Sequence, residues 1–239
     1  MTLQPIHTLQ SKHFVLIFTY TLAITLFAAI GIHAQQRREG VSVQMAVTTH
    51  AVPMPAADDE DAWVVAVTAD GRLYFGTRLL TTDGLAEQMK VTPRRRDQNL
   101  YVKADARTPF AGVQKVLEVG RSAYFDAPVL LTSQPQQEVS PGTIVPPMGM
   151  AVHLDMPPQP ESVVIDVLNS AQSASPFKVN GADVPGEALP RTVKQLLQDR
   201  TQRFVAVKAA GSVPFARVVD VINLCHAVGA EVVLSTPSL

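Results

Sequence analysis

Cysteine is nearly absent from this chain, because Cys225 is the only one in 239 residues. A single cysteine excludes an intrachain disulfide and any zinc site that needs several thiolates. Cys225 falls on the apolar face of an expected helix, where a free cysteine packs as a small hydrophobic residue. We therefore expect it to be buried and to play no chemical part.

The chain also has no large excess of positive or negative charge. The formal net charge is −1, and 46% hydrophobic with 17% charged residues is the balance of a folded protein. Such a balance offers no electrostatic attraction for nucleic acid or for an acidic substrate. We expect no nucleic-acid partner.

Signatures of catalysis are also absent. The chain has no GxSxG, no Walker loop, no GxGxxG and no HExxH spacing. Asp70 and Asp105 are the carboxylates nearest strand ends in the first half, and a lone aspartate in such a place usually caps a turn. The histidines are scattered along the chain at His7, His13, His33, His50, His153 and His226. The sequence therefore predicts a protein that is not an enzyme and has no cofactor and no metal.

Residues 14–34, FVLIFTYTLAITLFAAIGIHA, contain no Asp, Glu, Lys or Arg. They match the ~20 residues that a helix needs to cross a bilayer. A buried core helix would show a polar face, which this segment lacks. A signal peptide has a shorter apolar region of roughly 7–15 residues and small residues at its cleavage site, where this chain would place Ile32. We expect a retained transmembrane helix, with a cleaved signal peptide as the alternative, and the flanking charges leave its orientation open.

What the chain does contain is an internal repeat. Residues 100–132 and 204–236 align at one constant offset, without a gap from the first strand to near the end of a helix. Each copy begins with β-branched and aromatic residues, continues with a proline that suits the first turn of a helix, and closes with a second strand. Thr108 is the expected N-cap of the first of these helices. The identical pairs include Lys103 and Lys208, Pro109 and Pro214, and Phe110 and Phe215.

A hairpin and a helix precede the repeated unit in each half. In the first half, strands at 63–68 and 73–75 flank an Asp-Gly turn at 70–71, and Thr82 or Asp83 caps a short helix. The second half has strands at 163–168 and 177–179 and a helix at 186–199. The predicted fold class is therefore α+β, with a transmembrane helix followed by two small β-β-α-β-α-β domains.

The segments between these elements complete the predicted organisation. Residues 133–160 are rich in proline and glutamine, and within them 150–157 form an extended segment that can pair with a sheet edge. The predicted parts are an N-terminal segment at 1–13, the membrane helix at 14–34, an extended tether at 35–61, a first domain at 62–132, a linker at 133–160 and a second domain at 161–239.

Several short motifs of the first half point to a family through their order and spacing. They are VVAVTADGRLYF, LLTTDGLAEQMK, QNLYVKADARTPFAGVQKVLE and the closing VLLT. Together they resemble the periplasmic domain of the ExbD/TolR biopolymer-transport family. Pro-Met-Pro and Asp-Met-Pro, upstream of the two halves, are similar to the Leu-Pro element that this family places after its membrane helix.

The resemblance implies a single-pass protein of the bacterial inner membrane, with residues 1–13 in the cytoplasm and the C-terminal domains in the periplasm. It implies two partners, an ExbB/TolQ-like polytopic subunit and a TonB/TolA-like protein that proton flow sets in motion. Members of the family dimerise around one periplasmic domain per chain. Since this chain has two such domains, we expect either a homodimer or a pseudo-dimer within one chain.

One departure from the family concerns the membrane helix. The family's helix carries an aspartate that takes up and releases protons, and an ionisable group in a bilayer is usually functional. Residues 14–34 have no aspartate, and the polar positions Thr19, Thr21 and Thr25 form hydrogen bonds but do not titrate. We expect an accessory component of a proton-motive-force-coupled transport complex that conducts no protons itself. The alternative is a periplasmic adaptor that binds peptidoglycan or an envelope protein outside any motor.

Overall fold

The computed structural model describes residues 40–93, 95, 97–135, 145–154, 162–169 and 175–235. The chain divides into two compact units, Met1–Arg38 and Glu39–Leu239, and the fold described below is that of the second. The expected membrane helix at 14–34, with Thr19, Thr21 and Thr25, lies outside the described residues. Within the described ranges, no helix combines the length and the apolar character needed to span a bilayer.

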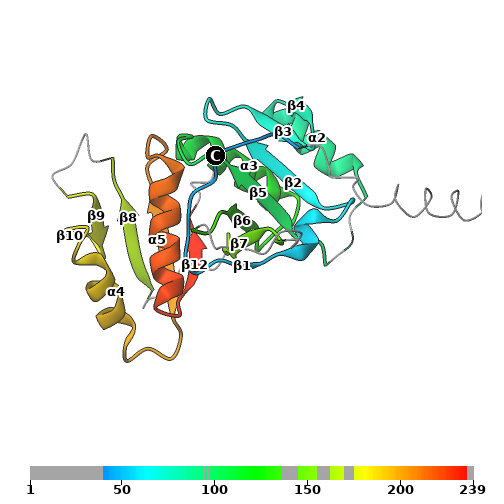
Figure 1. Cartoon of the computed structure of the whole chain (residues 1–239). Helices are drawn as coiled ribbons and strands as arrows, with labels where there is room; N and C mark the ends of the chain where they lie inside the picture. Colours follow the sequence, from blue (N-terminus) through cyan, green and yellow to red (C-terminus); the bar gives the residue numbers. More distant parts are fainter. Residues whose placement is uncertain are drawn as a thin grey trace, which may run out of the picture. The chain divides into compact units, whose positions relative to one another are not determined.

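The described residues form an α+β fold with two mixed sheets and four α-helices (Figure 1). The first sheet has the strand order β1-β7-β6-β5-β2-β3-β4. Strands β2, β5 and β6 run parallel at its centre, and the others pair antiparallel around them. The strands are β1 (Val52–Pro53), β2 (Trp63–Val67), β3 (Leu73–Phe75), β4 (Arg78–Leu80), β5 (Leu100–Ala104), β6 (Val129–Thr132) and β7 (Met148–Ala151).

The second sheet repeats this plan with fewer strands. Its order is β10-β9-β8-β11-β12, with β8, β11 and β12 parallel and the β9–β10 hairpin antiparallel. The strands are β8 (Val163–Val167), β9 (Phe177–Val179), β10 (Ala182–Val184), β11 (Phe204–Ala209) and β12 (Glu231–Leu234).

Two helices belong to each half: α2 (Thr82–Val91) and α3 (Phe110–Ser122) to the first, and α4 (Leu189–Leu197) and α5 (Phe215–Ala227) to the second. The expected cap of α2 is wrong by one residue, because Thr81 has the extended backbone of an N-cap and its Oγ1 accepts from the Gly84 N–H at 3.0 Å. Helix α4 begins three residues later than expected. Its proline lies in the first turn, where the missing N–H costs no hydrogen bond.

The shared order of elements in the two halves is confirmed. Strand-strand-strand-helix-strand-helix-strand runs from β2 to β6 and again from β8 to β12. The predicted β-β-α-β-α-β order omitted β4 and β10. Each of these three-residue strands follows a tight turn with positive φ, at Gly76 (62°) in one half and at Asn180 (50°) and Gly181 (84°) in the other. Three residues carry too little alternation to reveal a strand.

Residues 40–61 are not an extended tether, which corrects that expectation for the described part of the segment. They contribute β1 and the 3-10 helix η1 (Pro55–Asp58), and they bury Ala46, Ala51 and Ala57. Ala57 and Ala62 pack on the face of the first sheet that presents Tyr101 and Val129, whereas Ala46 and Ala51 belong to the larger core cluster. Small apolar side chains at intervals along a polar stretch are enough to hold that stretch against the fold.

The pairing of the proline-rich region with a sheet edge is confirmed over its described residues. Strand β7 pairs antiparallel with β6, placing Met150 opposite Leu130 and Ala151 opposite Val129. One hydrophobic core cluster contains buried residues of both halves. Whether each half folds as a separate domain therefore stays a prediction.

Candidate functional site

The most distinctive site of the molecule is a junction at which equivalent residues of the two halves bond to each other. The Phe110 N–H donates to the Val213 carbonyl at 2.8 Å, and the Phe215 N–H donates to the Thr108 carbonyl at 2.8 Å. The repeat offset converts Phe110 into Phe215 and Thr108 into Val213. Each bond is therefore the counterpart of the other.

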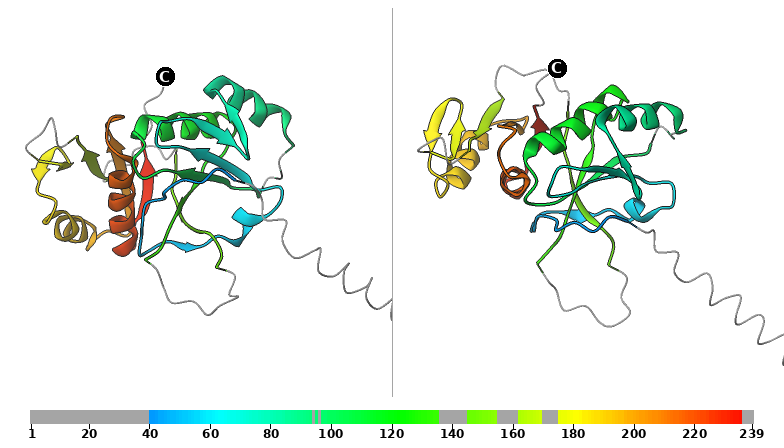
Figure 2. Two further views of the ribbon diagram at one scale, coloured as in Figure 1. Left: turned by 45° about the horizontal axis from the view of Figure 1, so that its top comes forward. Right: turned by 90° about the horizontal axis from the view of Figure 1, so that it is seen from above.

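A second pair of bonds has the same relation. The Ala111 N–H donates to the Gly211 carbonyl at 2.9 Å, and the Ala216 N–H donates to the Ala106 carbonyl at 2.9 Å. Between the two pairs, Pro109 and Pro214 form an antiparallel bridge. Reciprocal contacts of this kind are characteristic of a two-fold, isologous interface. Here such an interface lies within one chain, beside the starts of α3 and α5 (Figure 2).

These four bonds satisfy the first amides of both helices. The first N–H groups of an α-helix have no partner within the helix and need another acceptor. Neither α3 nor α5 has a side-chain cap, and their first two N–H groups are the donors of the four bonds. We call this set the reciprocal cap, since each helix is capped by carbonyls of the other half.

The reciprocal cap corrects the expected N-terminus of α3. Pro109 is the N-cap residue and not the first helical residue, with φ −58° and ψ 137°, and Pro214 has the same geometry. Thr108 does not cap the helix. Its buried Oγ1 has no hydrogen-bond partner, while its carbonyl accepts from the opposite half.

Close packing at the junction requires a glycine on one side. A Cβ placed on Gly211 would lie 3.0 Å from the Cβ of Ala111, closer than side chains normally pack. The equivalent residue of the first half is Ala106, so the two sides of the reciprocal cap are similar but not identical.

A second contact between the halves runs along β12. The His153 N–H donates to the Val232 carbonyl, and the His153 carbonyl accepts from the Leu234 N–H, both at 2.8 Å. The neighbouring Val152 and Leu154 amides bond to carbonyls of the first half. The His153 ring also contacts Glu231, with Nε2 3.2 Å from Oε2. One short segment thus pairs with both halves through its two edges.

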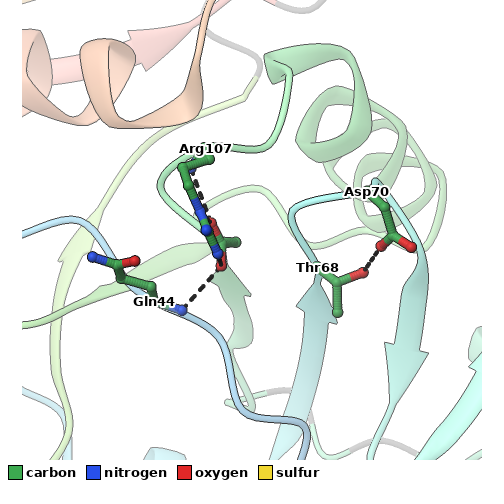
Figure 3. A network of polar contacts seen from close by, with 5 residues as sticks. Gln44, Thr68, Asp70 and Arg107 are labelled. Carbon is green, nitrogen blue, oxygen red and sulfur yellow. Dashed lines mark hydrogen bonds and ion pairs between the residues drawn. The ribbon is translucent and has the colours of Figure 1, made fainter.

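Asp105 accepts several hydrogen bonds, and its partners Gln44 and Arg107 are labelled in Figure 3. Its side chain is 4% exposed and accepts from the Gln44 and Arg107 amides, both at 3.1 Å. The Arg107 guanidinium adds bonds of 2.8 and 3.0 Å. Hydrogen bonds from Arg107 come first among the causes that hold the Asp105 pKa well below its ordinary value, against the opposing effect of burial. This aspartate closes a turn and anchors residue 44.

Asp70 has a similar local role at the β2–β3 turn. It accepts a hydrogen bond from the Thr68 hydroxyl (Figure 3). It also pairs with Arg72. The Thr68 bond is the largest cause of its lowered pKa. Asp70 and Asp105 therefore both bond to residues of their own turns, as lone aspartates at strand ends commonly do.

The single cysteine is buried, as expected, and burial raises the pKa of the Cys225 thiol to about 12. Within the part of the chain that the structure describes, no three His, Cys, Asp or Glu side chains are grouped so that they could hold a metal ion.

Sequence reasoning missed Asn223 and Gly211, which connect the halves. Asn223 lies on the polar side of α5 and Gly211 in a loop, positions that the repeat pattern leaves unconstrained. The sequence offered one indication of their role: the two halves differ at these positions, because the repeat aligns Asn223 with Glu118 and Gly211 with Ala106. Comparison with protein-family models, curated proteins and solved structures finds no match to this chain.

Proposed function

We propose that this chain is a membrane-anchored, ExbD/TolR-like component of a proton-motive-force-coupled complex for biopolymer or protein transport. The observation that carries the proposal is the reciprocal cap, by which two equivalent halves pair about a local pseudo-two-fold relation. The family that the sequence resembles works as dimers of a single periplasmic domain. A pair formed inside one chain supplies the same arrangement without a second subunit.

In this proposal the chain binds partners and carries out no chemistry. Residues 14–34 anchor it in the inner membrane, with the paired halves in the periplasm. An ExbB/TolQ-like polytopic subunit surrounds or flanks the anchor, and a TonB/TolA-like protein receives the motion. Because the anchor has no aspartate or glutamate, the protons pass elsewhere in the complex.

The decisive experiment is purification of the full-length protein from its own membranes in mild detergent, followed by mass spectrometry of the co-purifying proteins. The proposal predicts a polytopic ring-type subunit in the eluate. Recovery with peptidoglycan or an envelope protein, and with no such subunit, contradicts it and favours the adaptor hypothesis.

The contribution of the reciprocal cap is tested by Gly211→Val, whose side chain collides with Ala111. Gly186→Val is the matched control, because a Cβ there meets only Phe177 at an ordinary 3.5 Å. We expect the first variant to lose the polytopic subunit and the control to keep it. Hydrogen exchange of the Phe110 and Phe215 amides verifies that only the first variant opens the junction. Retention of the subunit by an opened junction contradicts the role of the paired halves.

The proton path is tested separately in the membrane segment. Replacing Thr19, Thr21 and Thr25 together by alanine removes its main hydrogen-bonding side chains without changing its charge. We expect proton flux through the assembled complex to be unchanged. Loss of flux with assembly intact would show that this helix takes part in proton transfer.

A further inference from the structure

The N-terminal segment of the described chain is fastened to α5 by one side chain. Asn223 Oδ1 accepts from the Thr49 N–H at 3.1 Å and from the His50 N–H at 2.9 Å. Its Nδ2 donates to Thr49 Oγ1 at 3.3 Å. Residues 49 and 50 belong to the stretch that covers the first sheet, whereas Asn223 belongs to the second half. The contact therefore joins segments more than 170 residues apart.

His226 lies three residues further along α5, on the same side of the helix as Asn223. The backbone of Ala151 in β7 interacts with its ring and favours the charged form. Its Nε2 is buried and has no hydrogen-bond partner. A buried Nε2 without a partner fits the neutral ring in which this nitrogen carries no hydrogen.

Protonation of His226 makes its buried ring unfavourable. A charged ring carries a hydrogen on Nε2, where the surroundings offer no acceptor, and a buried donor without a partner is destabilising. Burial is the largest cause that lowers the His226 pKa, the Ala151 backbone opposes it, and charge on His50 lowers it further. The neutral ring is the form that fits the closed contact.

The charged groups on the neighbouring elements do not stabilise a protonated His226. His50 comes from the covering segment, and its coulombic effect lowers the His226 pKa. His153, which follows β7, and Glu231 in β12 contact each other. Asp220 on α5 itself interacts with Arg217. No carboxylate among these compensates a charge on His226.

We propose that Thr49, His50, Asn223 and His226 form a pH-sensitive latch, which holds the N-terminal segment on α5 at neutral pH and releases it when His226 is protonated. The sign follows from the ordinary value of 6.5 and its lowering in the closed state. Below pH 6.5 the open state binds more protons than the closed state, so acid favours opening. Above that value the latch has its full stability.

The test is amide hydrogen exchange of Thr49 and His50 in the full-length protein in detergent, between pH 7.5 and 5.5, corrected for intrinsic exchange rates. We expect the protection of both amides to fall by up to about tenfold over this range, since one unit of pKa corresponds to tenfold in equilibrium. A change below about twofold overturns the latch, because a titrating ring then has no effect on the contact.

Two variants separate His226 from the other histidines. H226Q removes the titrating ring, and we expect it to flatten the pH dependence. H153Q is the matched control, since it removes a histidine from the adjacent contact, and it should retain the fall in protection. An unchanged fall in H226Q, or its disappearance only in H153Q, contradicts the proposal.

A second measurement needs no variant and so does not depend on the folding of H226Q. The ring proton signal of His226 is followed by NMR through the same pH range in the native sequence. We expect its midpoint to coincide with that of the Thr49 amide protection. Midpoints separated by more than about one pH unit show that opening is controlled by another group.

Discussion

The two halves of this protein share one plan but bury their sheets differently. In the first, the row Val64, Tyr101 and Val129 crosses three parallel strands on the face away from α2 and α3. Tyr101 and Val129 are 4% and 2% exposed beneath the covering residues 45–62. In the second, the equivalent row of Val164, Ala206 and Val233 is only half-buried.

The difference teaches that a duplicated sequence need not give duplicated surroundings. The first sheet gains β1, η1 and β7 from segments that flank the repeat, whereas the described part of the second sheet consists of repeat strands alone. Its open row holds smaller side chains, with Ala206 where the first half has Tyr101. The covered row of the first sheet therefore holds the larger side chains, and the open row of the second sheet holds the smaller ones.

The largest expected effect is on the unfolding free energy, and it comes from truncating the first helical residue that both halves share. Phe110 and Phe215 are equivalent first residues of α3 and α5, and both are at most 1% exposed. We expect Phe110→Ala and Phe215→Ala each to cost about 3–5 kcal/mol of unfolding free energy, because each leaves a cavity in the shared core. Chemical denaturation measures both. A difference above about 2 kcal/mol between them would mean that the two helix starts are not energetically equivalent.

Asp105 tests an element that only the first half possesses, since the second half has Ala210 in its place. We expect Asp105→Asn to cost about 2–3 kcal/mol near neutral pH, since it weakens charge-assisted bonds to a buried carboxylate. The lowered pKa adds a pH signature. Its contribution is complete above the ordinary value of 3.8 and is lost as the pH falls below that value towards the folded pKa.

Denaturant titrations of both proteins between pH 7 and pH 2 reveal this signature. The native protein should lose stability relative to the variant in the acid part of the range. Parallel curves for the two proteins would show that Asp105 is not the group whose pKa is lowered by folding.

The covered and open rows are compared directly by removing the same two methyl groups from equivalent valines. Val129 is 2% exposed and Val233 is half-buried. We expect Val129→Ala to cost about 2 kcal/mol and Val233→Ala less than about 1 kcal/mol, in proportion to the apolar area withdrawn from water. Thermal or chemical unfolding measures both. Equal losses would mean that the row in the second half is covered as well as that in the first.

The smallest expected effect concerns the residue that follows the C-cap of each long helix. Tyr124 has φ 62°, and its counterpart Gly229 has φ 72°, a region that favours glycine. We expect Tyr124→Gly to stabilise the protein by about 0.5–1 kcal/mol through relief of backbone strain, and Gly229→Ala to destabilise it by a similar amount. A loss of stability in Tyr124→Gly would show that contacts of the tyrosine side chain outweigh the strain.

The repeat was predictable because its signals are local. Apolar periodicity and the Pro-Phe pair placed α3 and α5 within a residue of their observed starts. Strands β4 and β10 escaped because three residues show no period, and the covering segment escaped because its apolar residues are few and separated by polar ones. The membrane helix at 14–34 and the family resemblance stay predictions.

The sequence by itself determined the α+β class, the order of elements in the two halves and the equivalence of their residues, since these depend on side-chain patterns within each segment. Only the tertiary structure decided which carbonyls cap α3 and α5, which segment covers the first sheet and which side chains meet at His226. The first amides of a helix bond to any acceptor that packing brings within reach. The choice of that acceptor belongs to the packing of the halves, which no local pattern encodes.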